Sequence, residues 1–107
     1  MIVLNKLSQD QGVELEKLFQ CLESYLAEGK KPEYVFFYAD AVSQTVVSHA
    51  ACKRWQRLAQ LGLTLKVCPN ALEHRHLLDQ VALGFEVAGL ARLFADMSAS
   101  DEVVCYG

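Results

Sequence analysis

The stretch LKVCPNALEHRH, residues 65–76, gathers the side chains best suited to chemistry: Cys68, His74, Arg75 and His76. An apolar run ends at Cys68, and a proline follows it. Pro69 has no N–H and a φ fixed near the helical value, so it fits the first position of a helix and keeps the preceding residue out of it. Cys68 is therefore expected to be an N-cap, with its sulfur facing the free N–H groups of Asn70 and Ala71. Their partial positive charge favours the thiolate, which is the nucleophilic form of cysteine.

Two cations follow this cysteine and could add to the effect. His74 and Arg75 lie within two turns of Cys68, and we expect them to help hold an anionic sulfur. The competing interpretation is that Cys68 simply ends a buried strand, because free cysteine commonly packs as a small apolar residue. The two interpretations differ in whether solvent and neighbouring positive charge reach the sulfur. A sulfur enclosed by methyl groups would argue against a reactive role.

The histidines do not indicate a metal site. His74 and His76 are two residues apart, which on a helix separates their directions by about 200 degrees. A closed zinc site would also need a fourth ligand that the segment does not supply. The sequence contains no GxGxxG, P-loop or GxSxG motif, so it gives no support for dinucleotide binding, phosphate binding or serine hydrolase chemistry. We therefore expect neither a metal nor a cofactor.

The other three cysteines are interpreted from their local context. No CxxC pair occurs, and a chain of this size folds without bridges, so all four are expected to be reduced thiols. Cys21, beside the apolar stripe of a helix, and Cys52, one turn before a tryptophan, are expected to pack in the interior. Cys105 lies in a terminal strand near the chain end, where exposure and a role of its own are open.

Hydrophobic patterning predicts the elements that position these residues. Apolar, β-branched and aromatic runs predict five strands, at residues 1–5, 33–38, 63–67, 81–87 and 102–106. Apolar residues at spacings of three and four, with glycine or proline at the boundaries, predict helices at residues 13–28, 50–61, 69–78 and 89–97. Residues 40–49 fit neither period and are expected to form a loop or short helix on the rim.

Strands that alternate with helices imply a three-layer α/β/α fold with a five-stranded parallel sheet. Reactive groups in such folds gather beyond the carboxyl ends of the strands, where the loops face each other. Asn5, Asp40, Cys68 and residues 88–89 follow strand ends, so we expect Asn5 and Asp40 to form the rim of a site around Cys68.

Composition limits the classes of protein that remain. The chain of 107 residues is 52% hydrophobic and is expected to form one domain, residues 1–107. Its net charge of −3 is spread along the chain, so there is no basic stripe for a nucleic acid. The apolar runs are far too short to span a bilayer, and the first residues do not read as a signal peptide. A cytoplasmic protein is expected.

Three segments resemble one known family over nearly the full length of the chain. VFFYADAV (residues 35–42) is similar to the second strand and following turn of the DsrE/TusD family of sulfur-relay proteins. RWQRLAQLGLTLKVC (54–68) is similar to its helix, glycine, strand and cysteine, and GFEVAGLARLFADM (84–97) with DEVVCY is similar to its last strand, helix and strand. The order and spacing of the three segments together carry the resemblance.

The resemblance implies a function for Cys68. In that family a single cysteine after the third strand accepts sulfane sulfur as a persulfide and passes it to a cysteine of a partner protein. Cys68 stands at the matching position. The resemblance further implies a five-stranded parallel DsrE-like fold, donor and acceptor proteins with reactive cysteines, and trimers or hexamers built from identical or paralogous subunits. The pathways implied are 2-thiouridine formation on tRNA or sulfur oxidation.

Two alternatives to a sulfurtransferase remain. In a non-catalytic assembly subunit Cys68 would be inert, and Val42, Val46 and Val47 would pack against sister chains. In a thiol redox module Cys68 would need a resolving cysteine, and none is close in sequence.

Overall fold

The core of the protein is a parallel β-sheet. The computed structural model describes residues 2–4, 11–30, 32–99 and 103–106. Its strands are β1 (Ile2–Leu4), β2 (Val35–Phe37), β3 (Leu65–Val67), β4 (Phe85–Val87) and β5 (Val104–Tyr106). They lie in the order β4-β3-β2-β1-β5, and every neighbouring pair is parallel. The predicted α/β fold with a parallel sheet is confirmed, and the carboxyl ends of all the strands therefore meet at one edge.

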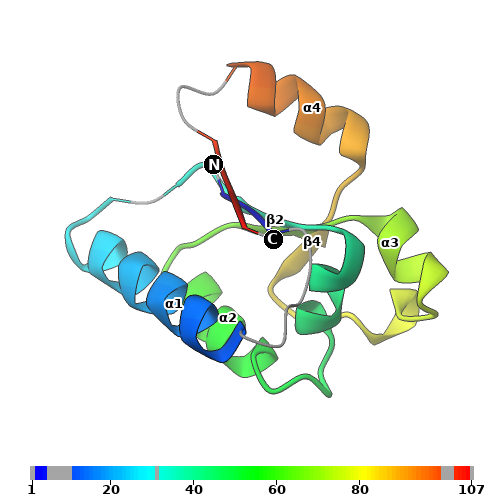
Figure 1. Cartoon of the computed structure of the whole chain (residues 1–107), viewed down its shortest axis with the longest axis horizontal. Helices are drawn as coiled ribbons and strands as arrows, with labels where there is room; N and C mark the ends of the chain where they lie inside the picture. Colours follow the sequence, from blue (N-terminus) through cyan, green and yellow to red (C-terminus); the bar gives the residue numbers. More distant parts are fainter. Residues whose placement is uncertain (1, 5–10, 31, 100–102, 107) are drawn as a thin grey trace.

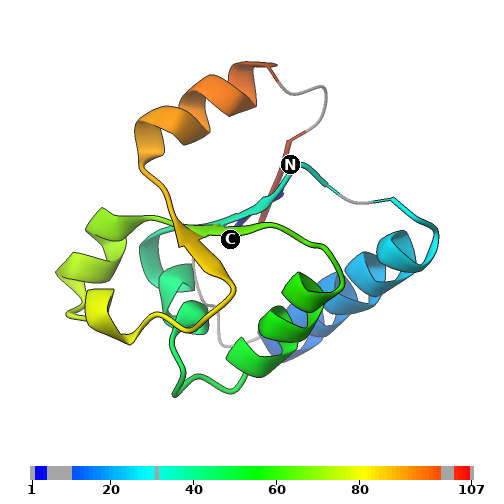
Figure 2. The same cartoon turned by 180° about the vertical axis from the view of Figure 1, so that it is seen from behind.

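Helices cover both faces of this sheet (Figures 1 and 2). Figure 1 shows α1 (Gln11–Ala27) and α2 (Cys52–Gln60) side by side below the sheet and α4 (Leu90–Ala99) above it. The sequence predicted these helices because their apolar residues recur every three or four positions. Cys52, Trp55 and Leu58, for example, are the buried residues of α2 and stand three apart.

Aromatic side chains fill the layer between the sheet and the paired helices. Trp55 is fully buried, and its ring lies 4.6 Å from the ring of Phe19 on α1 and 4.9 Å from that of Phe37 on β2, measured between centroids. The indole N–H of Trp55 donates to the side-chain oxygen of Gln44 at 2.8 Å, and Gln44 is itself buried. Aromatic rings at these separations attract each other beyond the area they bury. This packing fixes α2, and through Gln44 the segment after β2, against the sheet.

The segment after β2, expected to form a loop or short helix, is a 3₁₀ helix, η1 (Ala39–Thr45). Two other segments differ from the expectations. Helix α3 (Pro69–His74) is shorter than predicted, because His76 has φ of 55°, a left-handed value that does not continue a helix; a second 3₁₀ helix, η2 (Leu78–Gln80), follows. The fourth strand begins only at Phe85, after Gly84 with φ of 98°, whereas Val81 forms an isolated antiparallel bridge with Val46.

No helix in the described part of the chain is both long enough and apolar enough to cross a membrane.

Candidate functional site at the carboxyl edge of the sheet

Cys68 occupies the backbone position that the sequence predicted. It follows β3 directly, and its N–H donates to the carbonyl of Phe37 at 2.9 Å, which continues the pairing of β3 with β2. Its φ and ψ of −73° and 121° are extended, and Pro69 stands at the start of α3. The carbonyl of Cys68 accepts from the N–H of Leu72 at 3.3 Å, as an N-cap carbonyl does. The backbone prediction for this residue is confirmed.

The side chain of Cys68 does not behave as predicted. The residue is only 2% exposed and belongs to the main apolar cluster, together with Val42 and Leu72. Its side chain makes no capping hydrogen bond, so the expected contact of the sulfur with the N–H groups of Asn70 and Ala71 is absent. The cause is packing: Leu65 and Val67 of β3 are buried, and the residue after the strand still lies in the interior, where a small apolar thiol is stabilised by burial. The site is therefore closed in this conformation.

An ion pair joins η1 to the end of α3, the helix that Cys68 begins. The Nε and Nη2 groups of Arg75 donate to one carboxylate oxygen of Asp40 at 3.2 and 2.6 Å, and Nη1 donates to the carbonyl of Ala71 at 3.0 Å. Arg75 follows α3 and Asp40 lies in η1, so the pair links these two elements. The structure thus brings together two residues that the sequence predicted near the site. The guanidinium group is bound to a carboxylate rather than directed at a sulfur.

The backbone beside this ion pair is in an unfavourable conformation. Among the described residues other than glycine, the two with positive φ are Ala39 at 50° and His76 at 55°. Ala39 precedes Asp40, and His76 follows Arg75. A left-handed conformation costs a residue with a side chain about 1–2 kcal/mol, and such positions cluster at functional sites. No feature of the sequence signalled this strain.

The remaining predicted site residues differ in exposure. His74 is exposed and is the last residue of α3, about 9 Å along the helix axis from Cys68 at the usual rise per residue. Asn70 is also exposed, whereas Ala71 is buried. Asn5 lies outside the described residues. Among the described residues predicted to stabilise the sulfur or form the rim, Arg75 pairs with Asp40 and donates to the carbonyl of Ala71. Ala71 also belongs to the same apolar cluster as Cys68.

The three other cysteines have different surroundings. Cys52 is 1% exposed, and burial raises the pKa of its thiol, so the prediction that it packs in the interior is confirmed. Cys21 is exposed, and the same prediction for it was wrong, because this position of α1 faces away from the sheet. The backbone of Cys105 pairs with Val3, but its side chain lies outside the described part of the structure.

Two of the three valines predicted to pack against sister chains are buried within this chain. Val42 is fully buried, and Val46 is 3% exposed. That part of the assembly-subunit hypothesis was wrong, because η1 folds back onto the core of its own chain. Val47 is 68% exposed and is available to another surface.

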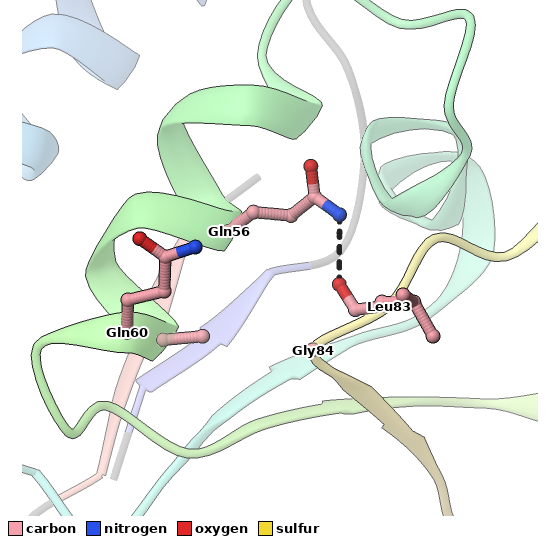
Figure 3. Close-up of a pocket in the computed structure, with 5 residues that line it drawn as sticks. Gln56, Gln60, Leu83 and Gly84 are labelled. Atoms are coloured by element: carbon pink, nitrogen blue, oxygen red, sulfur yellow. Dashed lines mark hydrogen bonds between the residues drawn. The ribbon is translucent and has the colours of Figure 1, made fainter.

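A hollow of about 380 Å³ lies between α2 and the segment before β4. Figure 3 shows the residues that line it. It is lined by Gln56, Ala59, Gln60, Leu83 and Gly84. The side-chain amide of Gln56 donates across it to the carbonyl of Leu83 at 2.9 Å. Gly84 precedes β4, so the hollow opens at the amino ends of the strands, away from Cys68. Its lining contains neither a charged nor a nucleophilic side chain.

Comparison with known proteins identifies relatives of the whole chain. The sequence model of the DsrE/DsrF-like family matches residues 6–106. No curated protein matches the sequence. The solved structures with a similar fold include the YchN protein from E. coli, with a TM-score of 0.78, 14% identity, and 98% of this chain and 97% of that chain covered.

Two further structures have the same fold. The protein MTH1491 from Methanobacterium thermoautotrophicum, described as of unknown function, has a TM-score of 0.76 and 12% identity over 98% of this chain and 96% of that one. The protein BT1422 from Bacteroides thetaiotaomicron, also of unknown function, has a TM-score of 0.78 and 14% identity over 98% of this chain and 92% of that one. At these identities the likeness to all three structures shows the fold alone.

Proposed function

Since this chain belongs to the DsrE/DsrF-like family, we propose that it works in sulfur relay and carries sulfane sulfur as a persulfide on Cys68. The observation that supports this proposal is the backbone position of Cys68. It lies at the carboxyl end of β3, where it begins α3 ahead of Pro69. Loops at this edge of a parallel sheet are where ligands and reactive groups gather.

The proposed reaction is an exchange between thiols that needs no added oxidant. The Cys68 thiolate attacks the outer sulfur of a donor persulfide, so a sulfur–sulfur bond forms on Cys68 while the donor's own bond breaks and its thiolate leaves. An acceptor thiolate then attacks the outer sulfur of the Cys68 persulfide, and the Cys68 thiolate is released. One sulfur atom moves in each step, and the cysteine returns to its starting state.

The burial of Cys68 sets a condition on this reaction. At 2% exposure the thiol cannot meet a donor, so the segments that pack around it must separate before transfer. Closing of these segments again after the first step would shelter the persulfide until the second, because a closed core excludes other thiols.

The test is transfer of labelled sulfur. The purified chain is incubated with a cysteine desulfurase and labelled cysteine, and label is located by mass spectrometry without reductant. We expect label on wild type and on Cys52→Ser and Cys21→Ser, which remove a buried and an exposed thiol, and its loss in Cys68→Ser. Equal labelling of wild type and Cys68→Ser would refute the proposal.

A non-catalytic assembly subunit is the second candidate, and the burial of Cys68 favours it, since buried structural cysteines are inert. Alkylation separates the two candidates, because Cys52 is equally buried and reports opening of the core. In a carrier Cys68 should be alkylated faster than Cys52 in the folded protein. In an assembly subunit both should react at the same slow rate, which is set by global unfolding.

The proposal extends to partners and location. We propose a cytoplasmic protein that exchanges sulfur with donor and acceptor proteins through their cysteines and assembles as a trimer or hexamer, alone or with paralogous subunits. The relay would serve either tRNA thiolation or sulfur oxidation. Light scattering after size exclusion tests the assembly: a mass near the 11.9 kDa of one chain across micromolar concentrations would refute it.

A further inference from the structure

We propose that the ion pair between Asp40 and Arg75 is a latch that controls access to Cys68. This inference rests on the proposed function, since it concerns how the same cysteine is reached. The latch holds η1 against α3, and its opening would let the first turn of α3 move away from η1 and uncover the thiol.

The geometry places the latch across η1 and α3, which pack against each other and both contribute side chains to the apolar cluster that holds Cys68. Cys68 begins α3 and Arg75 follows its end, while η1 packs against α3 and contributes Val42 to the same apolar cluster as Cys68. Arg75 also donates to the carbonyl of Ala71, so its guanidinium group ties the first turns of α3 to the carboxylate on η1. Breaking the contact with Asp40 frees this link without removing a core side chain.

The two ends of η1 are held differently. Near its carboxyl end, Gln44 accepts a hydrogen bond from Trp55 in the interior, where neither residue is exposed to water. Near its amino end, the Asp40 carboxylate is 61% exposed and the Arg75 side chain 32%. A buried anchor resists exchange with solvent, whereas an exposed ion pair is weakened by water and salt. We infer that η1 opens from its Asp40 end.

Backbone strain opposes the closed state. Ala39 and His76, the two described non-glycine residues with positive φ, adjoin the two partners of the ion pair. Residues hold such conformations only where surrounding contacts impose them, and the strain is relieved when those contacts break. The closed state is thus held by the ion pair and the apolar packing against a local tendency to open, which is what a two-state latch requires.

Site-resolved alkylation tests this inference. Asp40→Asn and Arg75→Gln remove the charge of one partner, and the charge-reversed double variant D40R/R75D restores an ion pair of opposite direction. Loss of an exposed ion pair should raise the alkylation rate of Cys68 by about two- to fivefold in each single variant. The double variant should return toward the wild-type rate. The alkylation rate of Cys52, equally buried but in α2, should not change.

Each outcome bears on the latch. Unchanged Cys68 rates in both single variants would refute it, and so would a parallel rise at Cys52, because that would mean the ion pair only stabilises the whole fold. Persulfide uptake by wild type is measured separately. Uptake on Cys68 with no effect of Asp40→Asn would refute the latch and leave the proposed function standing. Faster alkylation of Cys68 in the single variants, together with no persulfide on wild type, would support the latch and refute the proposed function.

Discussion

The buried hydrogen bond between Trp55 and Gln44 gives the sharpest stability prediction, because it anchors the element that carries Asp40. Gln44 is 1% exposed and Trp55 is fully buried, and the two atoms are 2.8 Å apart. The replacement Gln44→Leu keeps a side chain of similar volume but leaves the indole N–H without its partner. The variant should fold and should be less stable than wild type.

The magnitude follows from the burial of the orphaned donor. A buried polar group that loses its partner costs about 1–3 kcal/mol, so we expect the free energy of unfolding to fall by about 2 kcal/mol. For a domain of this size each kcal/mol lowers the melting temperature by about 4–8 °C, which predicts a decrease of roughly 10 °C.

Chemical denaturation in a double-mutant cycle measures whether the reasoning is right. Trp55→Phe removes the N–H donor. In that background, Gln44→Leu should lower the free energy of unfolding by at least about 1 kcal/mol less than it does in wild type. The control is Gln60→Leu, the same replacement at an exposed amide on α2, which should change stability by less than about 0.5 kcal/mol. If Gln44→Leu lowered the free energy of unfolding equally in the two backgrounds, the loss of stability would not come from the hydrogen bond.

Three further changes have predicted outcomes. Burial lowers the pKa of His49 below its ordinary 6.5, so the free energy of unfolding should be full above pH 6.5 and should fall as the pH drops below it. His49→Asn should reduce this dependence of the melting temperature on pH between pH 7.5 and 5. The Tyr34 hydroxyl donates to the Asp96 carboxylate at 2.7 Å and lowers the pKa of Asp96 below 3.8. The stability that this bond contributes is full above pH 3.8 and is lost as the pH falls through the lowered pKa. Tyr34→Phe should therefore weaken the acid dependence of thermal melts below pH 5. Gly84→Ala should lower the melting temperature by at least about 4 °C, because φ of 98° strains any residue with a side chain; an unchanged melt would contradict this.

Local patterning predicted the elements well where one period dominates. The three-residue spacing of Cys52, Trp55 and Leu58 is sufficient to predict a helix with one buried face. The run around Val35–Phe37 predicted a strand covered on both faces, and all three residues are buried. Residues 39–45 have no such period, so the sequence predicted only a loop or short helix there. The hydrogen bond that this segment accepts at Gln44 comes from Trp55, 11 positions away, and no local pattern indicates it.

Local sequence is enough to locate Cys68: an apolar run that ends before a proline places it at the carboxyl end of a strand and the start of a helix. It did not determine whether the thiol meets solvent. The fold buries the thiol in an apolar cluster to which η1 and α3 contribute, and it pairs Asp40 with Arg75, 35 positions away. The physical reason is that the exposure of a side chain depends on which distant segments pack over it, whereas periodicity and capping report only the residues within a turn or two.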